Sequence, residues 1–277
     1  MKKFLWHYKR ARRDGHGLRF LWRSFLHTTH ISSLITFNRG GVEFYCHNDP
    51  FSFWLWNHTD ELRADELFFE RFLREGDVVV DAGANIGLLT LRAAKIVEQE
   101  GKVVSIEPHP ETFSWLEKNC SLNKFLNIDL YNIAVGDGEK KVPFTDFKIK
   151  DVNKVSEKEG TLLLPMTTLD TLCENLSRCV LLKLDVEGFE LPALFGAENL
   201  LKKTDVIMFE SSPRNFELQN YALQHIFKYL ELQGFFVYKT DNNFNLEKLD
   251  QSYETVQKYE NLFAVKDISF LEKRLQG

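Results

Sequence analysis

The sequence predicts an α/β protein built on a doubly wound, mostly parallel seven-stranded sheet with an N-terminal cap. One observation is the alternation of strand and helix patterns that begins near residue 61 and continues toward the C-terminus. Such alternation is typical of parallel sheets with helical crossovers. The other observation is the stretch DVVVDAGANIG, residues 77–87, in which three valines lead into a glycine turn. Runs of valine are typical of a central strand that is covered on both faces.

Seven segments have the composition of strands: Val78–Ala82, Lys102–Glu107, Asp129–Ala134, Val180–Asp185, Asp205–Glu210, Phe235–Lys239 and Leu262–Val265. Helices are predicted over residues 61–73, 87–98, 111–122, 191–201 and 216–232, with Gly76 ending the first. No helix pattern separates the last two strands, so we expect the final strand to run antiparallel. Residues 137–167 interrupt the alternation and are expected to form a loop or a small hairpin.

Residues 1–60 are expected to form a basic, aromatic extension and cap, separate from a main domain of residues 61–277. In this extension, apolar residues recur at helical spacing at Leu18, Leu21, Trp22, Phe25 and Leu26. This spacing predicts a helix with one apolar face, and Arg19 and Arg23 lie off that face. Residues 34–58 are rich in aromatic and turn residues and predict short strands or a folded-over cap.

The net charge of −5 is unevenly distributed, because the first thirty residues hold eight Lys/Arg against a single acid, Asp14. The acidic remainder argues against a nucleic-acid-binding body. Four scattered cysteines without a CxxC pair indicate neither a zinc site nor a disulfide framework. No apolar run approaches the ~18 residues of a membrane span, and Arg19 and Arg23 interrupt any signal-peptide pattern. The expected location is therefore the cytoplasm.

In a doubly wound sheet, ligands bind beyond the carboxyl ends of the strands, where the turn after Val80 lies. Gly83 permits a tight turn, and Gly87 permits close packing of strand and helix, because neither has a Cβ. The dinucleotide pattern G-x-G-x-x-G lacks its second and third glycines here, and Asp81 is a poor neighbour for a pyrophosphate. S-adenosylmethionine (SAM) fits better, because it carries no phosphate and Asp81 can attract its α-ammonium group.

Two further strand ends carry acids. Glu107 lies at the carboxyl end of the second strand, in VVSIEPHP, where it can accept both ribose hydroxyls of SAM. Asp185 ends the fourth strand in LLKLDVEGFE, next to the expected position of the methyl group. A carboxylate at the end of an apolar strand is costly unless something pairs with it. Glu187 and Glu190 either belong to this site or cap the following helix and interact with its dipole.

Five motifs in this order resemble the FkbM-type family of SAM-dependent methyltransferases: VVVDAGANIG, SIEPHPETF, NIAVGD, MTTLDTL and LLKLDVEGFE. The resemblance covers roughly residues 76–212, and the first 60 residues match no family pattern. It implies a class I, Rossmann-like fold, SAM as the methyl donor, and methylation of hydroxyl groups on sugars, glycolipids, polysaccharides or secondary metabolites.

The resemblance also implies roles for individual residues. The implied SAM loop is Asp81, Gly83, Asn85 and Gly87, the ribose acid is Glu107, the residues flanking adenine are Asn132, Ala134 and Asp137, and the strand-four pair is Asp185 and Glu187.

Methylation of a hydroxyl group needs a general base or a metal ion, because an alcohol is a weak nucleophile at neutral pH. Asp185 and Glu210 end adjacent strands, so we expect one of them to take the hydroxyl proton, with His109 as a second-rank candidate. A metal-assisted reaction needs several oxygen ligands together. Asp185, Glu187 and Glu210 could supply them, but the sequence does not show that they converge, so no metal site is assigned.

Three other functions fit the sequence less well than O-methyl transfer. A SAM-binding scaffold without activity is disfavoured, because a scaffold has no physical need for acids at three strand ends. An N-methyltransferase commonly has an Asn/Asp-Pro-Pro-aromatic turn after strand four, where this chain has DVEG. A nicotinamide-dependent dehydrogenase is disfavoured by the missing glycines.

Residues 1–30 have two main interpretations. The helix at 18–26 could pack its apolar face on the main domain, with its cations solvated or paired to acidic groups. Alternatively, it could hold the enzyme peripherally at the anionic inner face of a membrane, which would suit a lipid-linked sugar acceptor. A nucleic-acid-binding arm is a weaker third interpretation, and no nucleic acid is expected as a partner.

Overall fold

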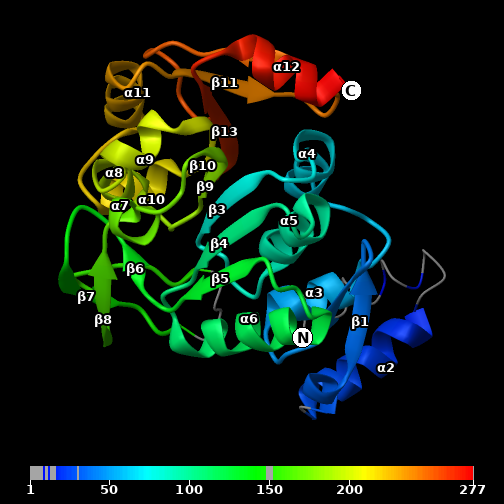
Figure 1. Cartoon of the computed structure of the whole chain (residues 1–277). Helices are drawn as coiled ribbons and strands as arrows, with labels where there is room; N and C mark the ends of the chain where they lie inside the picture. Colours follow the sequence, from blue (N-terminus) through cyan, green and yellow to red (C-terminus); the bar gives the residue numbers. More distant parts are fainter. Residues whose placement is uncertain (1–8, 10–11, 13–16, 30, 148–151, 277) are drawn as a thin grey trace. The chain divides into compact units, whose positions relative to one another are not determined.

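The computed structural model describes residues 9, 12, 17–29, 31–147 and 152–276 of the chain. The chain divides into two compact units, Met1–Leu62 and Arg63–Gly277. Every strand of the predicted sheet lies in the larger unit (Figure 1). Within the described ranges, no helix has the length and apolar character needed to cross a bilayer.

The larger unit contains an eight-stranded sheet with the order β12-β11-β13-β10-β9-β3-β4-β5. The parallel strands are β3 (Val78–Ala82), β4 (Lys102–Ile106), β5 (Ile128–Tyr131), β9 (Cys179–Leu184) and β10 (Thr204–Ser211). β13 (Glu260–Val265) lies between β10 and β11 (Phe236–Thr240) and is antiparallel to both. The predicted doubly wound, mostly parallel sheet is therefore confirmed, including the direction of its final strand.

An eighth strand, β12 (Leu246–Lys248), was not expected. It pairs antiparallel with β11 at the edge of the sheet. Its three residues, Leu-Glu-Lys, are too few to show the alternation that identifies a strand.

The predicted strand Asp129–Ala134 was wrong at its carboxyl end. β5 stops at Tyr131, and Ala134 begins β6 (Ala134–Val135) of a separate three-stranded sheet. The Asn132 side chain donates hydrogen bonds to the carbonyl groups of Glu107 and Pro108, at 2.9 and 3.0 Å, and so fixes the turn between the two sheets.

The small sheet is formed mostly by the stretch that interrupts the alternation. β7 (Lys140–Phe144) and β8 (Leu162–Thr167) form its antiparallel pair, and β6 lies beside β8. The expectation of a small hairpin within residues 137–167 is therefore confirmed, although residues 148–151 lie outside the described part of the chain.

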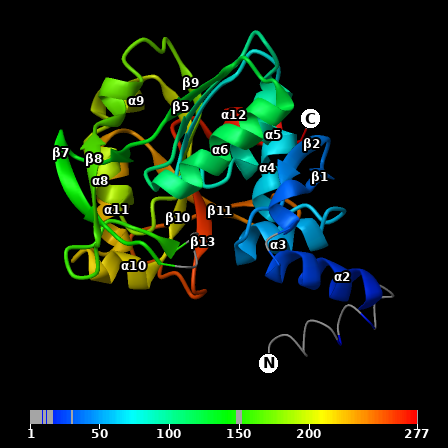
Figure 2. The ribbon, with the colours of Figure 1, turned by 90° about the horizontal axis from the view of Figure 1, so that it is seen from below.

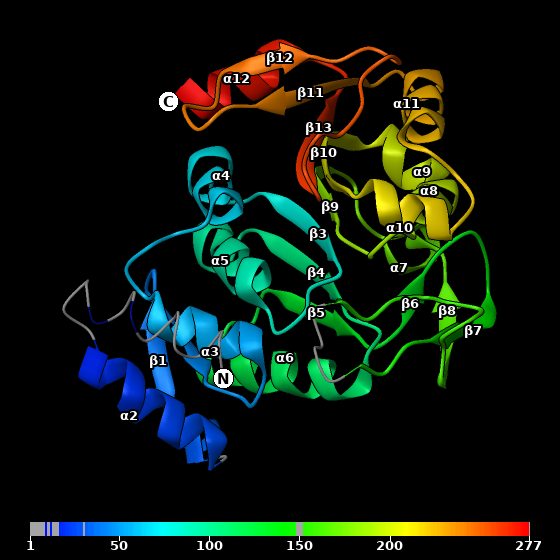
Figure 3. The same cartoon turned by 180° about the vertical axis from the view of Figure 1, so that it is seen from behind.

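Helices cover both faces of the large sheet (Figures 1 and 3). One layer contains α4 (Ala64–Phe72), α5 (Leu88–Val97) and α12 (Ile268–Gln276), and the other contains α8 (Glu190–Phe195), α9 (Glu198–Lys202) and α11 (Leu223–Leu232). Successive side chains of a central strand pack alternately against the two helical layers, because they point to opposite faces of the sheet. Val79 accordingly packs in the first layer and Val80 in the second. α6 (Pro110–Asn123) runs beside α5 (Figure 2).

Two predicted helices are interrupted. The segment 191–201 is divided into α8 and α9 around Gly196, where a Cβ would lie 2.0 Å from the carbonyl oxygen of Gly136. The segment 216–232 is divided into α10 (Pro213–Leu218) and α11 by Asn220, whose φ of 60° is incompatible with a helix. In both cases apolar spacing continues across the break, so periodicity alone predicted one helix.

The smaller unit begins in its described part with α2 (Gly17–Thr28), which confirms the helix expected at 18–26. A hairpin of β1 (Thr36–Arg39) and β2 (Val42–Tyr45) follows and confirms the expected short strands. α3 (Pro50–Asn57) was not predicted. Asp49 caps this helix, because its side chain accepts the backbone N–H groups of Phe51 and Ser52. The basic residues Lys2, Lys3, Arg10 and Arg13 lie outside the described residues.

Candidate active site at the carboxyl edge of the sheet

The order of the strands reverses between β3 and β9. The chain builds outward from β3 through β4 to β5 on one side, and from β9 to β10 on the other. In doubly wound sheets, the carboxyl ends of strands at such a reversal border the ligand-binding crevice. The predicted residues Asp81, Glu107, Asp185 and Glu210 all lie at or next to the carboxyl ends of these neighbouring strands.

The turn after β3 is built from three left-handed residues, Gly83 (φ 84°), Asn85 (φ 52°) and Gly87 (φ 94°). A Cβ at Gly83 would lie 1.8 Å from the carbonyl oxygen of Asp185, so only glycine lets this turn approach the end of β9. A Cβ at Gly87 would lie 2.8 Å from Leu116 of α6, so this glycine lets α5 begin against a neighbouring helix. The tight turn thus lies between β9 and α6.

Glu107 follows β4, and its carboxylate accepts the backbone N–H groups of Asn85 and His109 at 3.0 and 2.8 Å. Burial raises the pKa of Glu107 to about 7, although both N–H groups favour its charged form. Each N–H group takes a different carboxylate oxygen, and each oxygen can accept a further hydrogen bond. Two neighbouring acceptor oxygens suit a vicinal diol, and the expected contact of Glu107 with the ribose of SAM stays a prediction.

Asp81 is fully buried, and its carboxylate contacts the Thr90 hydroxyl at 2.6 Å and the Lys183 ammonium at 3.2 Å. Lys183 Nζ also lies 3.4 Å from Asp185 Oδ2 and donates to the carbonyl oxygen of Gly83 at 3.1 Å. Lys183 therefore bridges the ends of β3 and β9. The expected contact between Asp81 and the ammonium group of SAM stays a prediction, because this carboxylate faces Lys183 and Thr90 in the structure.

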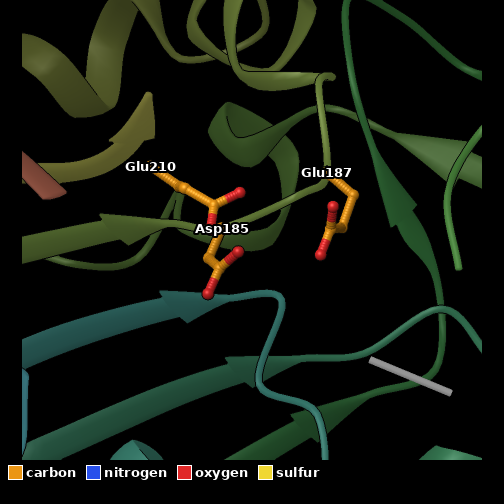
Figure 4. A group of neighbouring side chains, drawn as sticks. All are labelled: Asp185, Glu187 and Glu210. Carbon is orange, nitrogen blue, oxygen red and sulfur yellow. The ribbon is translucent and has the colours of Figure 1, made fainter. Parts of the chain in front are cut away.

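Three carboxylates, of Asp185, Glu187 and Glu210, converge at the ends of β9 and β10 (Figure 4). One oxygen from each lies within 4.8 Å of the other two. Burial, and then the charge of Asp185, raises the pKa of Glu187 to about 8. Burial, followed by the charges of Asp185 and Glu187, raises the pKa of Glu210 to about 9. The cluster therefore holds protons at neutral pH.

This cluster, which we call the acid triad, is the group of side chains in the described residues that could hold a divalent cation. Its oxygens are hard ligands of the kind that Mg²⁺ and Ca²⁺ prefer. Acidic groups also gather without a cation, and with no cation bound the raised pKa values of Glu187 and Glu210 favour their neutral forms.

Glu187 and Glu190 have different environments. Glu187 has a φ of 53°, and its carboxylate accepts a hydrogen bond from Asn215 Nδ2 at 2.7 Å. Glu190 is fully buried and accepts the backbone N–H groups of Val186 and Gly188 at 3.1 and 3.3 Å. Glu190 thus holds the backbone at the start of α8, whereas Glu187 belongs to the acid triad.

His109 has a structural position at the start of α6. Its ring Nδ1 lies 3.4 Å from the backbone nitrogen of Thr112, and Nε2 lies 3.1 Å from Asp146 Oδ1. The buried ring therefore joins the N-terminus of α6 to the segment after β7. A catalytic role for His109 stays a prediction.

The residues expected beside adenine lie around the start of the small sheet. Asn132 is exposed and binds the carbonyl groups of Glu107 and Pro108. Ala134 is buried in β6, and the exposed Asp137 pairs with Lys140 at 2.9 Å. Contact of these residues with adenine stays a prediction.

Sequence reasoning missed Lys183, Asn215 and Lys154. Lys183 could have been noticed, because it is the charged residue inside the apolar strand LLKL. Lys154 Nζ donates to Asn215 Oδ1 at 2.8 Å, so the segment after β7 reaches the acid triad through Asn215. Neither Asn215 nor Lys154 lies in a strand-end motif, so no pattern in the sequence identifies them.

Curated methyltransferases are similar in sequence to part of this chain. Hexuronic acid methyltransferase AglP of Haloferax volcanii is 29% identical over 162 residues, which cover 56% of this chain and 65% of that protein. Methyltransferase 1 of Beauveria bassiana is 25% identical over 164 residues, which cover 50% of this chain and 66% of that protein. The chain thus spans slightly less than two thirds of the length of these curated relatives.

A solved SAM-dependent O-methyltransferase from Thermotoga maritima is 15% identical at a TM-score of 0.41, covering 73% of this chain and 64% of that one. Residues 81–237, more than half of the chain, match the family described as Methyltransferase FkbM domain. The chain therefore belongs to the FkbM methyltransferase family, and its sheet has the Rossmann-like α/β architecture that the motifs predicted.

Proposed function

We propose that this protein is a SAM-dependent O-methyltransferase that methylates a hydroxyl group of a sugar or a sugar-containing glycolipid. The observation that carries the proposal is the position of the acid triad beside the glycine turn. The contact between Gly83 and the Asp185 backbone brings the two together. We assign this activity to residues 61–277, with residues 1–60 as an N-terminal extension.

Bound SAM would supply an electrophilic methyl group on a sulfonium, with a neutral thioether as leaving group. The residues of this chain then have to orient the acceptor and take its proton. Glu107 offers two acceptors to a ribose diol, and the Gly83 turn leaves backbone close to the crevice. A carboxylate of the acid triad would take the proton of the acceptor hydroxyl group as that oxygen is methylated.

Within the acid triad, we assign Glu210 as the general base that takes this proton. One oxygen of Asp185 is already engaged by Lys183, and one of Glu187 by Asn215. The pKa of Glu210, raised to about 9 by burial and then by Asp185 and Glu187, makes it a stronger base toward an alcohol than an ordinary carboxylate. Below this pKa, kcat/KM should rise with pH as Glu210 loses its proton.

Lys154 favours an acceptor that carries a carboxylate, such as a hexuronic acid. Its ammonium group lies next to Asn215, at the edge of the acid triad. The relative from Haloferax volcanii is named as a hexuronic acid methyltransferase. Lys154→Met should raise KM for a uronic acid acceptor while leaving KM for a neutral glycoside unchanged.

The test is transfer of label from methyl-tritiated SAM to a panel of uronic acid glycosides, neutral glycosides and amino sugars. The proposal predicts label in a hydroxyl group and a rate that falls at least about a hundredfold in Glu210→Gln. The control is Asp205→Asn, which removes a carboxylate from the opposite end of the same strand, where it pairs with Arg178. Label in an amine would indicate N-methylation. Binding of SAM without transfer of label, either to this panel or to a cell extract, would indicate a scaffold protein.

A further inference from the structure

The helix α2 in the smaller unit has an unusual distribution of apolar side chains. Leu18, Leu21, Trp22 and Phe25 lie on one face at helical spacing, and all four are exposed, Leu18 by 84%, Trp22 by 62% and Phe25 by 54%. The rings of Trp22 and Phe25 stack on one another at 6.0 Å. Leu34 ends the short helix η1 (Ile31–Leu34), which contacts α2, and is 81% exposed.

The opposite side of α2 is the one that packs within Met1–Leu62. Leu26 and Arg23 are buried, and Arg23 donates a hydrogen bond to the carbonyl oxygen of Trp56 and lies over its ring at 4.6 Å. Phe20 meets Phe53 edge to face at 6.1 Å. The packing of this unit therefore uses an arginine and leaves the aromatic face of the helix in solvent.

The charge of the unit indicates what covers that face. The first 62 residues contain nine Lys/Arg and five Asp/Glu, whereas the whole chain contains 35 and 40. The described cations Lys9 and Arg12 are exposed. A helix with exposed Trp, Phe and Leu in a cationic segment has the properties that favour insertion between the headgroups of an anionic bilayer.

We infer that the apolar face of α2, formed by Leu18, Leu21, Trp22, Phe25 and the adjacent Leu34, binds the surface of a membrane containing anionic phospholipids. The aromatic and leucine side chains would enter the headgroup region, and the cations would remain at the level of the phosphates. This inference does not depend on the methyl-transfer activity, and binding is measurable without an acceptor.

The test is co-sedimentation of the full chain with vesicles of phosphatidylcholine alone or mixed with phosphatidylglycerol. The inference predicts binding to the mixed vesicles, weakened by added salt and reduced at least about tenfold by Trp22→Ser/Phe25→Ser. Lys9→Glu/Arg12→Glu should also weaken it. The control Leu126→Ser/Val256→Ser removes two apolar side chains of the larger unit that are more exposed, by 92% and 93%, and should bind like the wild type.

Two alternative occupants give different results. If the face packs on the larger unit, Trp22→Ser/Phe25→Ser will lower Tm while the control does not, and vesicle binding will be absent. If it binds a second copy, the same variant will convert a dimer to a monomer in sedimentation velocity. Either result, or equal binding by the wild type and this variant, would overturn the inference.

Discussion

Replacing Lys183 should destabilise the protein strongly, because it leaves a buried carboxylate without its counter-charge. Asp81 is fully buried and the Lys183 side chain is only 6% exposed, so water screens little of their attraction. Burial alone would lower the pKa of Lys183, but Asp81 and Asp185 raise it above its usual value. Removing one partner of a buried ion pair typically costs about 3–5 kcal/mol. We therefore expect Lys183→Met to lower the free energy of unfolding by about 3 kcal/mol or more.

A double-mutant cycle isolates the contribution of this pair. Asp81→Asn alone leaves a buried cation, whereas Lys183→Met/Asp81→Asn removes both charges and should cost less than the sum of the two single changes. Urea unfolding followed by far-UV circular dichroism gives the four free energies. Lys102→Met is the matched control, because its pair with Asp129 is 43% and 42% exposed and should contribute about 1 kcal/mol or less. The reasoning would be refuted if Lys183→Met lowered the free energy of unfolding no more than this control does, or if the losses in the cycle were strictly additive.

Three further predictions concern the glycine turn and the acid triad. Gly83→Ala should lower the free energy of unfolding by about 3 kcal/mol or more, because its Cβ would clash with the Asp185 backbone and its φ is 84°. The control Gly138→Ala places a Cβ in open space and should be tolerated in the same urea experiment. The folded protein keeps protons on Glu187 and Glu210 above the ordinary carboxyl pKa of 4.5, so Tm should fall as pH rises from 5 to 9. Glu210→Gln should remove part of that fall, because each unit of pKa shift corresponds to about 1.4 kcal/mol of unfolding free energy. A fall in Tm as large as in the wild type would contradict the raised pKa. Excess EDTA should leave methyl transfer unchanged, because protons balance the triad, and a loss of activity that Mg²⁺ restores would instead assign it a cation.

The strands of the large sheet were predictable because they are buried on both faces. Three valines before Asp81, and LLKL before Asp185, can be recognised without tertiary information. The parallel direction of the central strands also followed from the alternation, since parallel neighbours need helical crossovers. The eighth strand and the two helix breaks were not predictable, because a three-residue edge strand and the close approach of Gly196 to Gly136 depend on tertiary packing.

The sequence predicted where the candidate site residues lie better than it predicted which side chains they contact. Carboxyl ends of adjacent parallel strands meet at one edge, so the proximity of Asp185 and Glu210 could be expected. The convergence of Glu187 on them could not, because it depends on a φ of 53° and on Asn215 of α10, 28 residues further along the chain. Likewise, the partner of Asp81 lies on another strand, and sequence spacing carries no information on which side chain fills the space beside a buried acid.

The central claim is that Glu107 and the glycine turn bind SAM at the reversal of the strand order. Calorimetric titration of the full chain with SAM tests it most directly, with Glu107→Gln as the probe and the exposed Glu117→Gln on α6 as the control. Each hydrogen bond to a charged acceptor contributes about 1.5–3 kcal/mol, so Glu107→Gln should weaken binding at least about tenfold. We predict saturable heat with one site in the wild type and the control. No heat in the wild type, or unchanged affinity in Glu107→Gln, would contradict the account.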